Sequence, residues 1–356
     1  MEVLERAYEK AAAHERLTCD EGTALLEHGD THILAALAHQ RRLRLHPEPV
    51  VTYIVERNIN YTNSCVTYCR FCAFYRRPGH AEEYVLSHAQ LGKKIEDVLR
   101  HGGVQILLQG GHHPGLPLSW YEEMLRFIRS NYPTINVHGF SAPEIEHIAG
   151  LEEMPVREVL ARLREAGMGT LPGGGAEILV DRVRDILAPL KTSSDSWIDV
   201  HRQAHGLGMR STATMMFGHA ETLAERVEHL ERVRRLQEET GGFTAFILWT
   251  FQPENTALRS YEKLESHQYL RTAAVSRLYL DNVANLQASW VTQGPRVAEI
   301  SLRAGVNDMG STMFEENVVS AAGTTYRMNA EQIERSIRLC GFQPRRRNVY
   351  YEEVAA

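Results

Sequence analysis

The sequence lacks any run of apolar residues long enough to cross a lipid bilayer. Its amino-terminal stretch, MEVLERAYEKAAAHERL, has the pattern of a charged amphipathic helix and contains no hydrophobic segment of the secretory kind. These two absences favour a protein that works in the cytoplasm, without a membrane partner, where cysteine thiols are kept reduced.

An excess of basic residues is also missing. Lysine and arginine number 39 against 45 aspartates and glutamates, which gives a formal net charge of −6. A nucleic-acid-binding protein would be expected to carry a basic stripe, so no nucleic-acid partner is expected. The one local cluster, Arg345–Arg346–Arg347, is interpreted as a solvated tail.

Signs of disorder are absent as well. The 356 residues are 43% hydrophobic and 24% charged, enough to build a sizeable core, and no low-complexity linker or fixed-period repeat interrupts them. The length suggests one large domain or two ordinary ones.

Hydrophobic periodicity predicts an α/β fold. Residues 1–46 have helical spacing, and from residue 50 apolar β-branched segments alternate with amphipathic helical ones. Strands are expected at 50–56, 104–108, 135–140, 168–171, 209–216, 243–251, 286–291 and near 306. Helices are expected at 87–101, 120–130, 156–166, 197–207, 223–239, 269–282, 297–304 and 330–340.

This alternation indicates parallel strands joined by right-handed crossovers. Six to eight such units in this length favour a TIM-like (β/α) barrel, with a doubly wound open sheet as the alternative. We expect an N-terminal helical extension over residues 1–49, a barrel core over 50–291, and a C-terminal completion and tail over 292–356.

Unusual polar and glycine-rich sequences follow the predicted strands, on the rim where barrels carry their chemistry. They are a cysteine loop after the first strand, then QGGHHP, SAPE, PGGGAE, TMMFGHAE, FQPENT, SWVTQG and NDMGSTMFEEN. Turns alone account for some glycine and proline, but not for this much histidine and carboxylate.

The cysteine loop is the most specific feature. Three of the five cysteines, Cys65, Cys69 and Cys72, fall within eight residues. Thiols this close usually share a metal. Structural zinc needs four ligands, and only His80 is available nearby as a fourth. An iron–sulfur cluster held by three cysteines would leave one iron open for a cofactor.

The C-x3-C-x-F-C spacing right after the first barrel strand resembles the signature of the radical S-adenosylmethionine (SAM) enzymes. The resemblance implies that the three cysteines hold a [4Fe-4S] cluster whose open iron binds SAM, and that Phe71 packs beside the adenine. Gln109, Gly110 and Gly111 match the glycine motif that meets the methionine amino group. A reducing electron donor such as flavodoxin or ferredoxin is implied too.

Further motifs over roughly residues 50–325 are similar to one clade of this family. That clade contains the futalosine-pathway enzymes of menaquinone biosynthesis and the deazaflavin synthases. The combination of FQPENT, SWVTQG and DMGSTMFEENVVSAAG is most similar to the cyclases of the clade. It implies a small-molecule substrate, a benzoate bearing a ribose, that loses hydrogen from C4′ and closes a ring onto its arene.

Several rim residues are candidates for the site. Ser141 and Glu144 are expected to contact the cofactor, with helix capping by Ser141 as the alternative. Glu177 follows three glycines that give clearance for cofactor and substrate. His219 is a candidate to bind substrate or shuttle a proton. Asp308 is a candidate to take the arene proton, or else to cap the turn at Gly310.

The remaining polar residues are either given a structural role or left without an assigned role. His201 and His205 are interpreted as a solvated helix face, and Glu315-Glu316-Asn317 as a helix start or a substrate contact. A benzoate substrate needs a partner for its carboxylate. Four arginines near predicted strand ends are candidates that the sequence does not separate, namely Arg57, Arg76, Arg182 and Arg210.

Two alternatives to the cyclase remain open from the sequence. One is another member of the same clade, either aminofutalosine synthase or a deazaflavin synthase. The other, from a different class, is a zinc-stabilised binding protein without radical chemistry.

Overall fold

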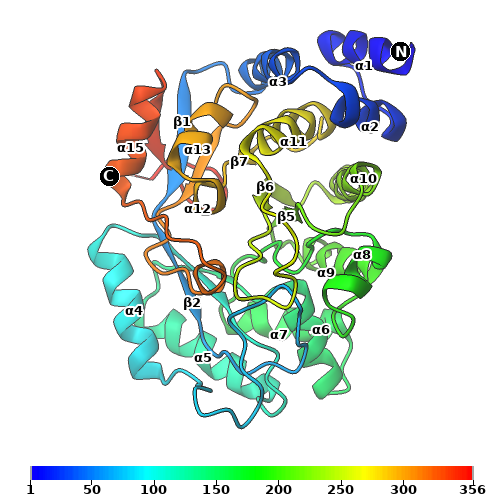
Figure 1. Ribbon diagram of the computed structural model, residues 1–356. Helices are drawn as coiled ribbons and strands as arrows, with labels where there is room; N and C mark the ends of the chain where they lie inside the picture. The colour runs from blue at the N-terminus through cyan, green and yellow to red at the C-terminus, as the bar shows by residue number, and fades with distance from the viewer. Residues whose placement is uncertain (1, 355–356) are drawn as a thin grey trace.

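The structure is a computed structural model that describes residues 2–354. Its first elements are three helices, α1 (Glu2–Ala13), α2 (Cys19–His28) and α3 (Thr31–Leu45), as the amino-terminal periodicity predicts. Thr18 and Glu21 form a capping box that starts α2. Helices α2 and α3 contact α10 (Leu223–Thr240) and α11 (Ser266–Tyr279), so this extension covers one side of the fold (Figure 1).

The strands form the wall of a barrel, and every pairing within the two sheets is parallel. In chain order they are β1 (Val50–Ile54), β2 (Glu56–Asn60), β3 (Gln105–Gln109), β4 (Asn136–Gly139), β5 (Ser211–Phe217), β6 (Phe243–Thr250), β7 (Leu286–Gln287), β8 (Asp308–Ser311) and β9 (Gln343–Arg346).

Strand pairing runs around the wall. One sheet has the order β2-β3-β4 and the other β5-β6-β7-β8-β1-β9. Isolated bridges from His138 to Thr170 and from Leu171 to Ser211 join β4 to β5. Since only Val55 separates β1 from β2, the pairing returns to the strand where it began. The predicted parallel α/β barrel is confirmed.

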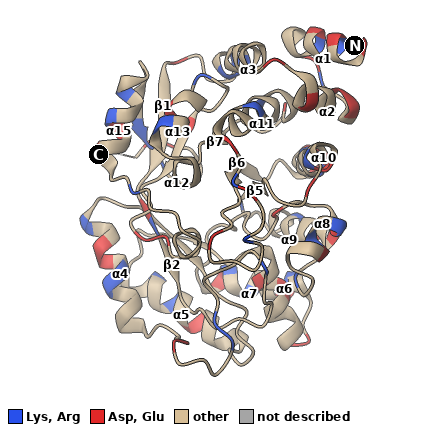
Figure 2. Ribbon diagram, viewed as in Figure 1, with Lys and Arg blue, Asp and Glu red and all other residues tan. Residues whose placement is uncertain are grey.

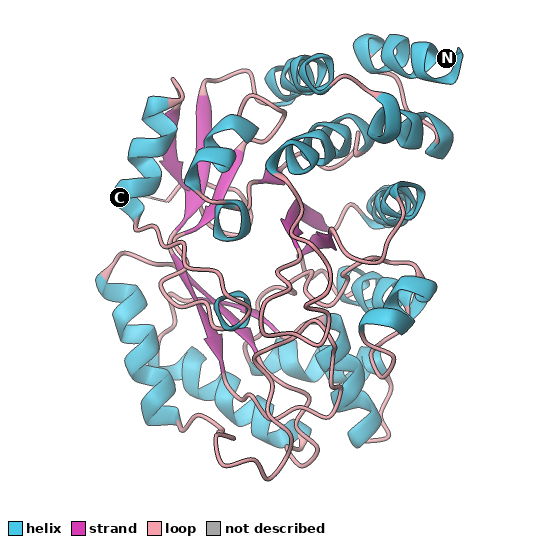
Figure 3. Cartoon of the chain, viewed as in Figure 1, coloured by secondary structure: helices cyan, strands magenta, loops and turns pink. Residues whose placement is uncertain are grey.

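Helices surround this wall on the outside, and long loops cross its mouth (Figures 1 and 3). Besides α10 and α11, these outer helices are α4 (His88–Arg100), α5 (Leu118–Asn131), α6 (Ala142–Leu151), α7 (Val156–Ala166), α8 (Asp181–Leu187), α9 (Ser194–Gly206), α13 (Pro295–Ser301) and α15 (Ala330–Leu339). The short helices α12 (Trp290–Gln293) and α14 (Val318–Ala321) belong instead to the loops at the mouth and contribute residues to the interior lining.

Side chains alternate between the two faces of each strand, as the period of two requires. In β3, Ile106 and Leu108 are fully buried on the side of the helices, whereas Gln105, Leu107 and Gln109 face the barrel interior. The apolar core therefore lies between strands and helices, and the barrel interior is lined by polar and apolar side chains together.

Charged residues of both signs are mixed on the outer helices, for example along α4 (Figure 2). No helix in residues 2–354 is long and apolar enough to cross a membrane.

The secondary structure differs from expectation in several places. Of the predicted strand 168–171, only Thr170 and Leu171 form isolated bridges. The predicted strand 286–291 ends at Gln287, and Trp290–Gln293 is helical, with Ser289 and Thr292 bonded through their hydroxyls at 2.7 Å. Helices α6 and α8 were not predicted. For α6 a signal was present, because Ser141-Ala142-Pro143-Glu144 has the capping-box spacing with proline in the first turn.

The interpretation of Arg345–Arg347 as a solvated tail is wrong. Residues 343–346 form β9, which pairs with β1, and Arg347 is only 5% exposed. Its guanidinium donates to Asp308 from Nε at 2.5 Å and from Nη2 at 2.8 Å. The buried carboxylate explains why an arginine enters the barrel.

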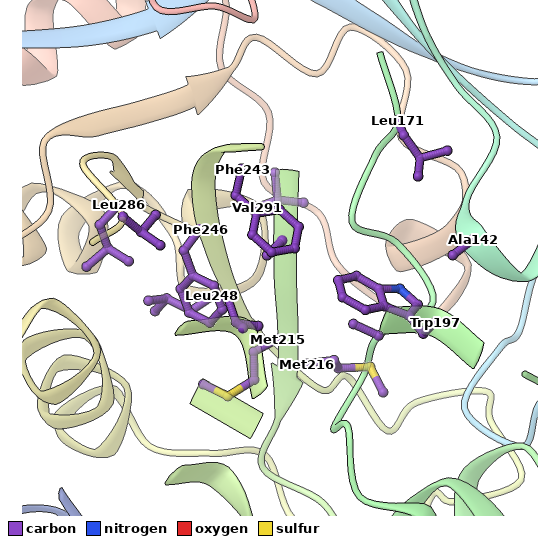
Figure 4. Packing of buried hydrophobic residues seen from close by; sticks show 14 of the residues in the cluster. Ala142, Leu171, Trp197, Met215, Met216, Phe243, Phe246, Leu248, Leu286 and Val291 are labelled. Carbon is purple, nitrogen blue, oxygen red and sulfur yellow. The ribbon is translucent and has the colours of Figure 1, made fainter. Parts of the chain in front are cut away.

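The solvated-face interpretation of His201 and His205 is also wrong. His201 is fully buried against Trp197, with ring centroids 3.9 Å apart, and both histidines hydrogen-bond the Ser211 hydroxyl. Figure 4 shows the Trp197 indole among the buried side chains of β5 and β6, so this helix face belongs to the core.

Replacing Asp308 by alanine should destabilise the fold by about 3–5 kcal/mol, because it leaves the Arg347 guanidinium buried without its carboxylate. Urea unfolding followed by circular dichroism measures the change. Asp195→Ala is the matched control, since the Asp195 side chain is 89% exposed where it pairs with Arg232. Equal midpoints for the two variants would contradict this account.

Candidate active site

A cavity of about 340 Å³ occupies the barrel interior. Its lining comes from the loops after several strands and from the inward faces of the strands. The predicted site residues that line it are Cys65, Cys69, Phe71, Cys72, Gln109, Gly110, Gly111, Ser141, Glu144 and Glu177. Ten of the twelve predicted positions therefore meet in one place.

The cysteine loop follows β2 and is held by backbone hydrogen bonds to two other loops and to the last residue of α8. The Val66 N–H donates to His112 O at 3.1 Å, and the Arg70 N–H donates to Leu187 O at 2.8 Å. The Ala257 N–H donates in turn to Arg70 O at 3.0 Å. Since loops from across the barrel mouth hold it, the loop presents its thiols to the cavity without a helix or strand of its own.

Two of the thiols, Cys69 and Cys72, are held in a setting that disfavours the free thiolate. Burial raises the pKa of Cys69 to about 12, although the nearby Lys191 opposes the shift. Burial raises the pKa of Cys72 as well. Such thiols become ligands when a metal displaces their protons, so folding prepares a site that a cationic cluster completes.

The donor set fits an iron–sulfur cluster better than a single ion. In residues 2–354 no three histidine, cysteine, aspartate or glutamate side chains are arranged to hold one metal ion. His80, the possible fourth zinc ligand, is exposed, and its ring accepts from the Glu82 N–H at 3.1 Å. In a cluster each cysteine binds a different iron, so three thiols need not converge on one point.

The two glycines after β3 let the chain pack closely against the cysteine loop. A Cβ on Gly110 would lie 2.5 Å from the Tyr61 ring, and one on Gly111 would lie 2.1 Å from Ser64 O. Their lack of a side chain thus serves contacts within the protein, where the sequence suggested room for a ligand. The backbone at Gly110 and Gly111 still lines the cavity.

Gly111→Ala should lower the iron and sulfide content of the purified protein several-fold, because the new Cβ pushes on Ser64, next to Cys65. Gly115→Ala is the matched control, since its Cβ would meet only His113, at 3.7 Å. Iron and sulfide analysis after anaerobic purification tests the pair. A fully loaded Gly111→Ala variant would show that the close contact does not position the loop.

Glu144 joins three elements of the rim. Its Oε1 accepts from the Tyr61 hydroxyl at 2.7 Å and from the Gly110 N–H at 2.9 Å, while Oε2 accepts from the N–H and hydroxyl of Ser141. Burial raises the pKa of Glu144, against these hydrogen bonds. The carboxyl is thus fully occupied in fixing the turn at Gly110.

Glu177 and Lys191 form a buried ion pair beside the cysteines. The Lys191 Nζ lies 2.6 Å from Glu177 Oε1 and 5.3 Å above the centre of the Phe71 ring. Burial alone would raise the pKa of Glu177, but Lys191 and Arg184 offset it and hold the pKa below its usual value. Sequence reasoning missed Lys191, because a lone lysine in a turn carries no recognisable pattern.

His219 is not brought to the cavity. Its side chain is fully buried, Nε2 bonds Met216 O at 2.9 Å, and Nδ1 accepts from the Ala220 N–H at 2.8 Å. Both ring nitrogens therefore serve the local loop. The expectation that His219 contacts substrate has no support in this geometry.

Asp308 is likewise removed from the cavity. Besides Arg347, its carboxylate accepts from the Thr52 hydroxyl at 2.5 Å and from the Gly310 N–H at 2.7 Å. The alternative role of capping the turn at Gly310 matches this geometry. As a fully buried carboxylate with four donors, Asp308 is a poor candidate for the proton acceptor.

The four arginine candidates for a substrate carboxylate lie elsewhere. Arg57 pairs with Asp97 and Glu315. Arg76 pairs with Glu82, Arg182 pairs with Glu225, and Arg210 donates to Gly241 O. None of the four lines the cavity.

The run Glu315-Glu316-Asn317 contains the predicted helix start. The carboxylate of Glu316 accepts from the N–H groups of residues 318–320, at the first turn of α14. Glu315 instead pairs with Lys94 and Arg57. Glu316 also lines the cavity, so its two proposed roles do not exclude each other.

One further carboxyl lines the cavity and was not predicted. Glu56 lies in β2 with its side chain inward and accepts a hydrogen bond from the Gln105 amide. Burial raises the pKa of Glu56, against the opposing effects of Gln105 and Arg347. Glu56 was missed because the predicted strand ended there, which left its inward direction undefined.

The geometry defines the class of site: a three-cysteine loop at the mouth of an α/β barrel, open to an internal cavity. The sequence matches the profile of the radical SAM superfamily over residues 59–233 and that of the CofH/MqnC C-terminal region over residues 240–355.

Comparison with individual proteins agrees with these family matches. The cyclic dehypoxanthine futalosine synthase of Halalkalibacterium halodurans is 48% identical over 97% of this chain and 94% of its own. The aminodeoxyfutalosine synthase of Thermus thermophilus is 39% identical over 97% and 94%. The FeFe-hydrogenase maturase HydG from Carboxydothermus hydrogenoformans shares the fold, with a TM-score of 0.75 at 17% identity, over 99% and 81% of the two chains.

The chain therefore belongs to the radical SAM superfamily, in the branch that carries the CofH/MqnC C-terminal region. Enzymes of this superfamily use a [4Fe-4S] cluster and SAM, which matches the cofactors that the cysteine loop predicts.

Proposed function

We propose that the protein is a radical SAM cyclase of the futalosine pathway to menaquinone, which converts dehypoxanthinylfutalosine to its cyclic form. The observation that carries the proposal is the opening of the three-cysteine loop onto a barrel cavity lined by both apolar and polar side chains. Within the branch, 48% identity to a cyclase against 39% to an aminodeoxyfutalosine synthase favours ring closure.

The cysteines would hold the cluster, which when bound with SAM supplies the adenosyl radical that abstracts hydrogen. Around it, Lys191 provides a cation for the methionine carboxylate, and the backbone at Gly110 is fixed by Glu144. The Phe71 ring at the cavity wall supplies an apolar face. These residues orient the cofactor, and a reducing partner such as flavodoxin or ferredoxin in the cytoplasm would supply the electron.

Ring closure onto the arene would end with the loss of one proton to a base and of one electron to an acceptor such as the oxidised cluster. The proton needs an acceptor in the cavity, and four carboxyls line it: Glu56, Glu144, Glu177 and Glu316. Three of them already have partners. Glu144 accepts from the Gly110 N–H, Glu177 pairs with Lys191, and Glu316 accepts from N–H groups in the first turn of α14. Glu56, held by the Gln105 amide, has spare acceptor capacity, and its raised pKa suits a general base.

Glu56→Gln should therefore abolish cyclic product, by about a hundredfold or more, while SAM cleavage continues. Release of 5′-deoxyadenosine without product is the expected signature. In the wild type the proton-transfer step should accelerate as pH rises through the raised pKa of Glu56, because only the carboxylate accepts a proton. Glu123→Gln, at an exposed position, is the control. If Glu56→Gln cyclised the substrate normally, the proton acceptor would be another group.

The choice between cyclase and aminodeoxyfutalosine synthase is tested by products. Reduced protein with a reconstituted cluster, incubated with SAM and dehypoxanthinylfutalosine, should give free 5′-deoxyadenosine and a product lighter by two hydrogens. Mass spectrometry distinguishes this from a product that has gained the adenosyl group, which would overturn the proposal. A Cys65/Cys69/Cys72→Ala variant should keep the barrel's circular dichroism and form neither product.

A further inference from the structure

Two cationic side chains line the cavity in the part of the chain that the structure describes, Lys191 and Arg347. Lys191 stands at the cysteine loop and is paired with Glu177. Arg347 follows β9 at the other end of the β1–β2 strand, where its N–H donates to Tyr53 O at 3.0 Å. The seven residue-to-residue steps of extended chain from Tyr53 to Asn60 span about 20 Å.

The Arg347 side chain is held rigidly and is only partly used. A guanidinium carries five N–H donors. Nε and Nη2 bond the Asp308 carboxylate, and Nη1 donates to Asn348 O at 3.1 Å. Two donors remain. Arg347 lines the cavity, whereas Asp308 does not.

Tyr351 lies directly beside this guanidinium. The Arg347 Cζ is 4.0 Å from the centre of the Tyr351 ring, and both residues line the cavity. The Tyr351 hydroxyl is buried and has no hydrogen-bond partner. Buried hydroxyls are rarely left unpaired, so an unpaired one on a residue that lines the cavity marks a candidate place for a ligand's polar atom.

The surrounding charges favour an anion there. Facing groups are the Asp308 carboxylate, paired to Arg347, and the carboxyl of Glu56, whose pKa is raised by burial. Nearby, Arg277 is fully engaged by backbone carbonyls and the Asn307 amide. Two guanidinium groups against these two carboxyls leave no net negative charge to repel an anion, whether or not Glu56 is ionised.

From this arrangement we infer that Arg347 and Tyr351 form the subsite for the aryl carboxylate of the substrate. The inference rests on the proposed function, which supplies a benzoate. The remaining Arg347 donors and the Tyr351 hydroxyl would bind the carboxylate oxygens. This end of the cavity lies away from the cysteines, so the subsite would turn the ribose toward the cofactor and set the arene near Glu56.

Binding of two small probes tests the subsite without any turnover. 3-Methoxybenzoate and 3-methoxybenzamide share the arene and differ only at the carboxyl group. Their dissociation constants are measured by NMR titration of the unreduced protein with its cluster in place. The wild type should bind the benzoate roughly tenfold or more tightly than the amide.

Variants then assign that preference to residues. Tyr351→Phe removes only the hydroxyl and should cut the preference several-fold. The double variant Asp308→Asn/Arg347→Gln replaces the ion pair by two amides, so that no charge is left buried alone, and should remove the preference. Tyr350→Phe is the matched control, because Tyr350 is 47% exposed on the same segment, and it should bind as the wild type does.

The outcomes separate the subsite from the function. No preference for the benzoate in the wild type would overturn the subsite, as would an undiminished preference in folded Tyr351→Phe and the double variant. If the double variant fails to fold, Tyr351→Phe alone decides. A preference that depends on Tyr351 in a protein unable to cyclise dehypoxanthinylfutalosine would refute the proposed reaction but keep the subsite.

Discussion

The barrel interior is held open, and the rest of the structure depends on how its polar groups are satisfied. Inward side chains such as Glu56 and Gln105 cannot fill the space as apolar residues would, so each must bond a neighbour or a ligand. Most polar side chains at the rim have partners within the protein. Glu144 accepts a hydrogen bond from the Gly110 N–H, and Glu177 forms an ion pair with Lys191. We place a ligand atom at the Tyr351 hydroxyl, which is buried without a partner on a residue that lines the cavity.

The same constraint explains why the two ends of the barrel carry different polar groups. At the mouth, ion pairs and hydrogen bonds fix the loops that carry the cysteines and glycines. At the other end the Asp308–Arg347 pair brings a cation inward from the carboxyl-terminal strand. Cofactor chemistry and substrate recognition are thus built by opposite ends of the chain, and the two matched family regions divide in the same order.

Much of this could be predicted from the sequence, where the signal was local. The cysteine spacing, the glycine turn and the strand–helix alternation need only neighbouring residues, and they located the barrel and ten of the site positions. Contacts between residues far apart in the sequence could not be predicted. Arg347 looked like a solvated charge because its partner lies 39 residues away, and Asp308 looked catalytic because that arginine was unknown. The predicted roles of individual site residues and the division into domains stay predictions.

The central claim is that a radical formed at the cysteine loop takes hydrogen from the ribose of a benzoate-bearing substrate. Dehypoxanthinylfutalosine deuterated at C4′ tests it most directly, with mass spectrometry of the 5′-deoxyadenosine released by the reduced enzyme. The account predicts one deuterium in that 5′-deoxyadenosine and none at C4′ of the cyclic product. Unlabelled 5′-deoxyadenosine alongside a product that keeps its deuterium would contradict it.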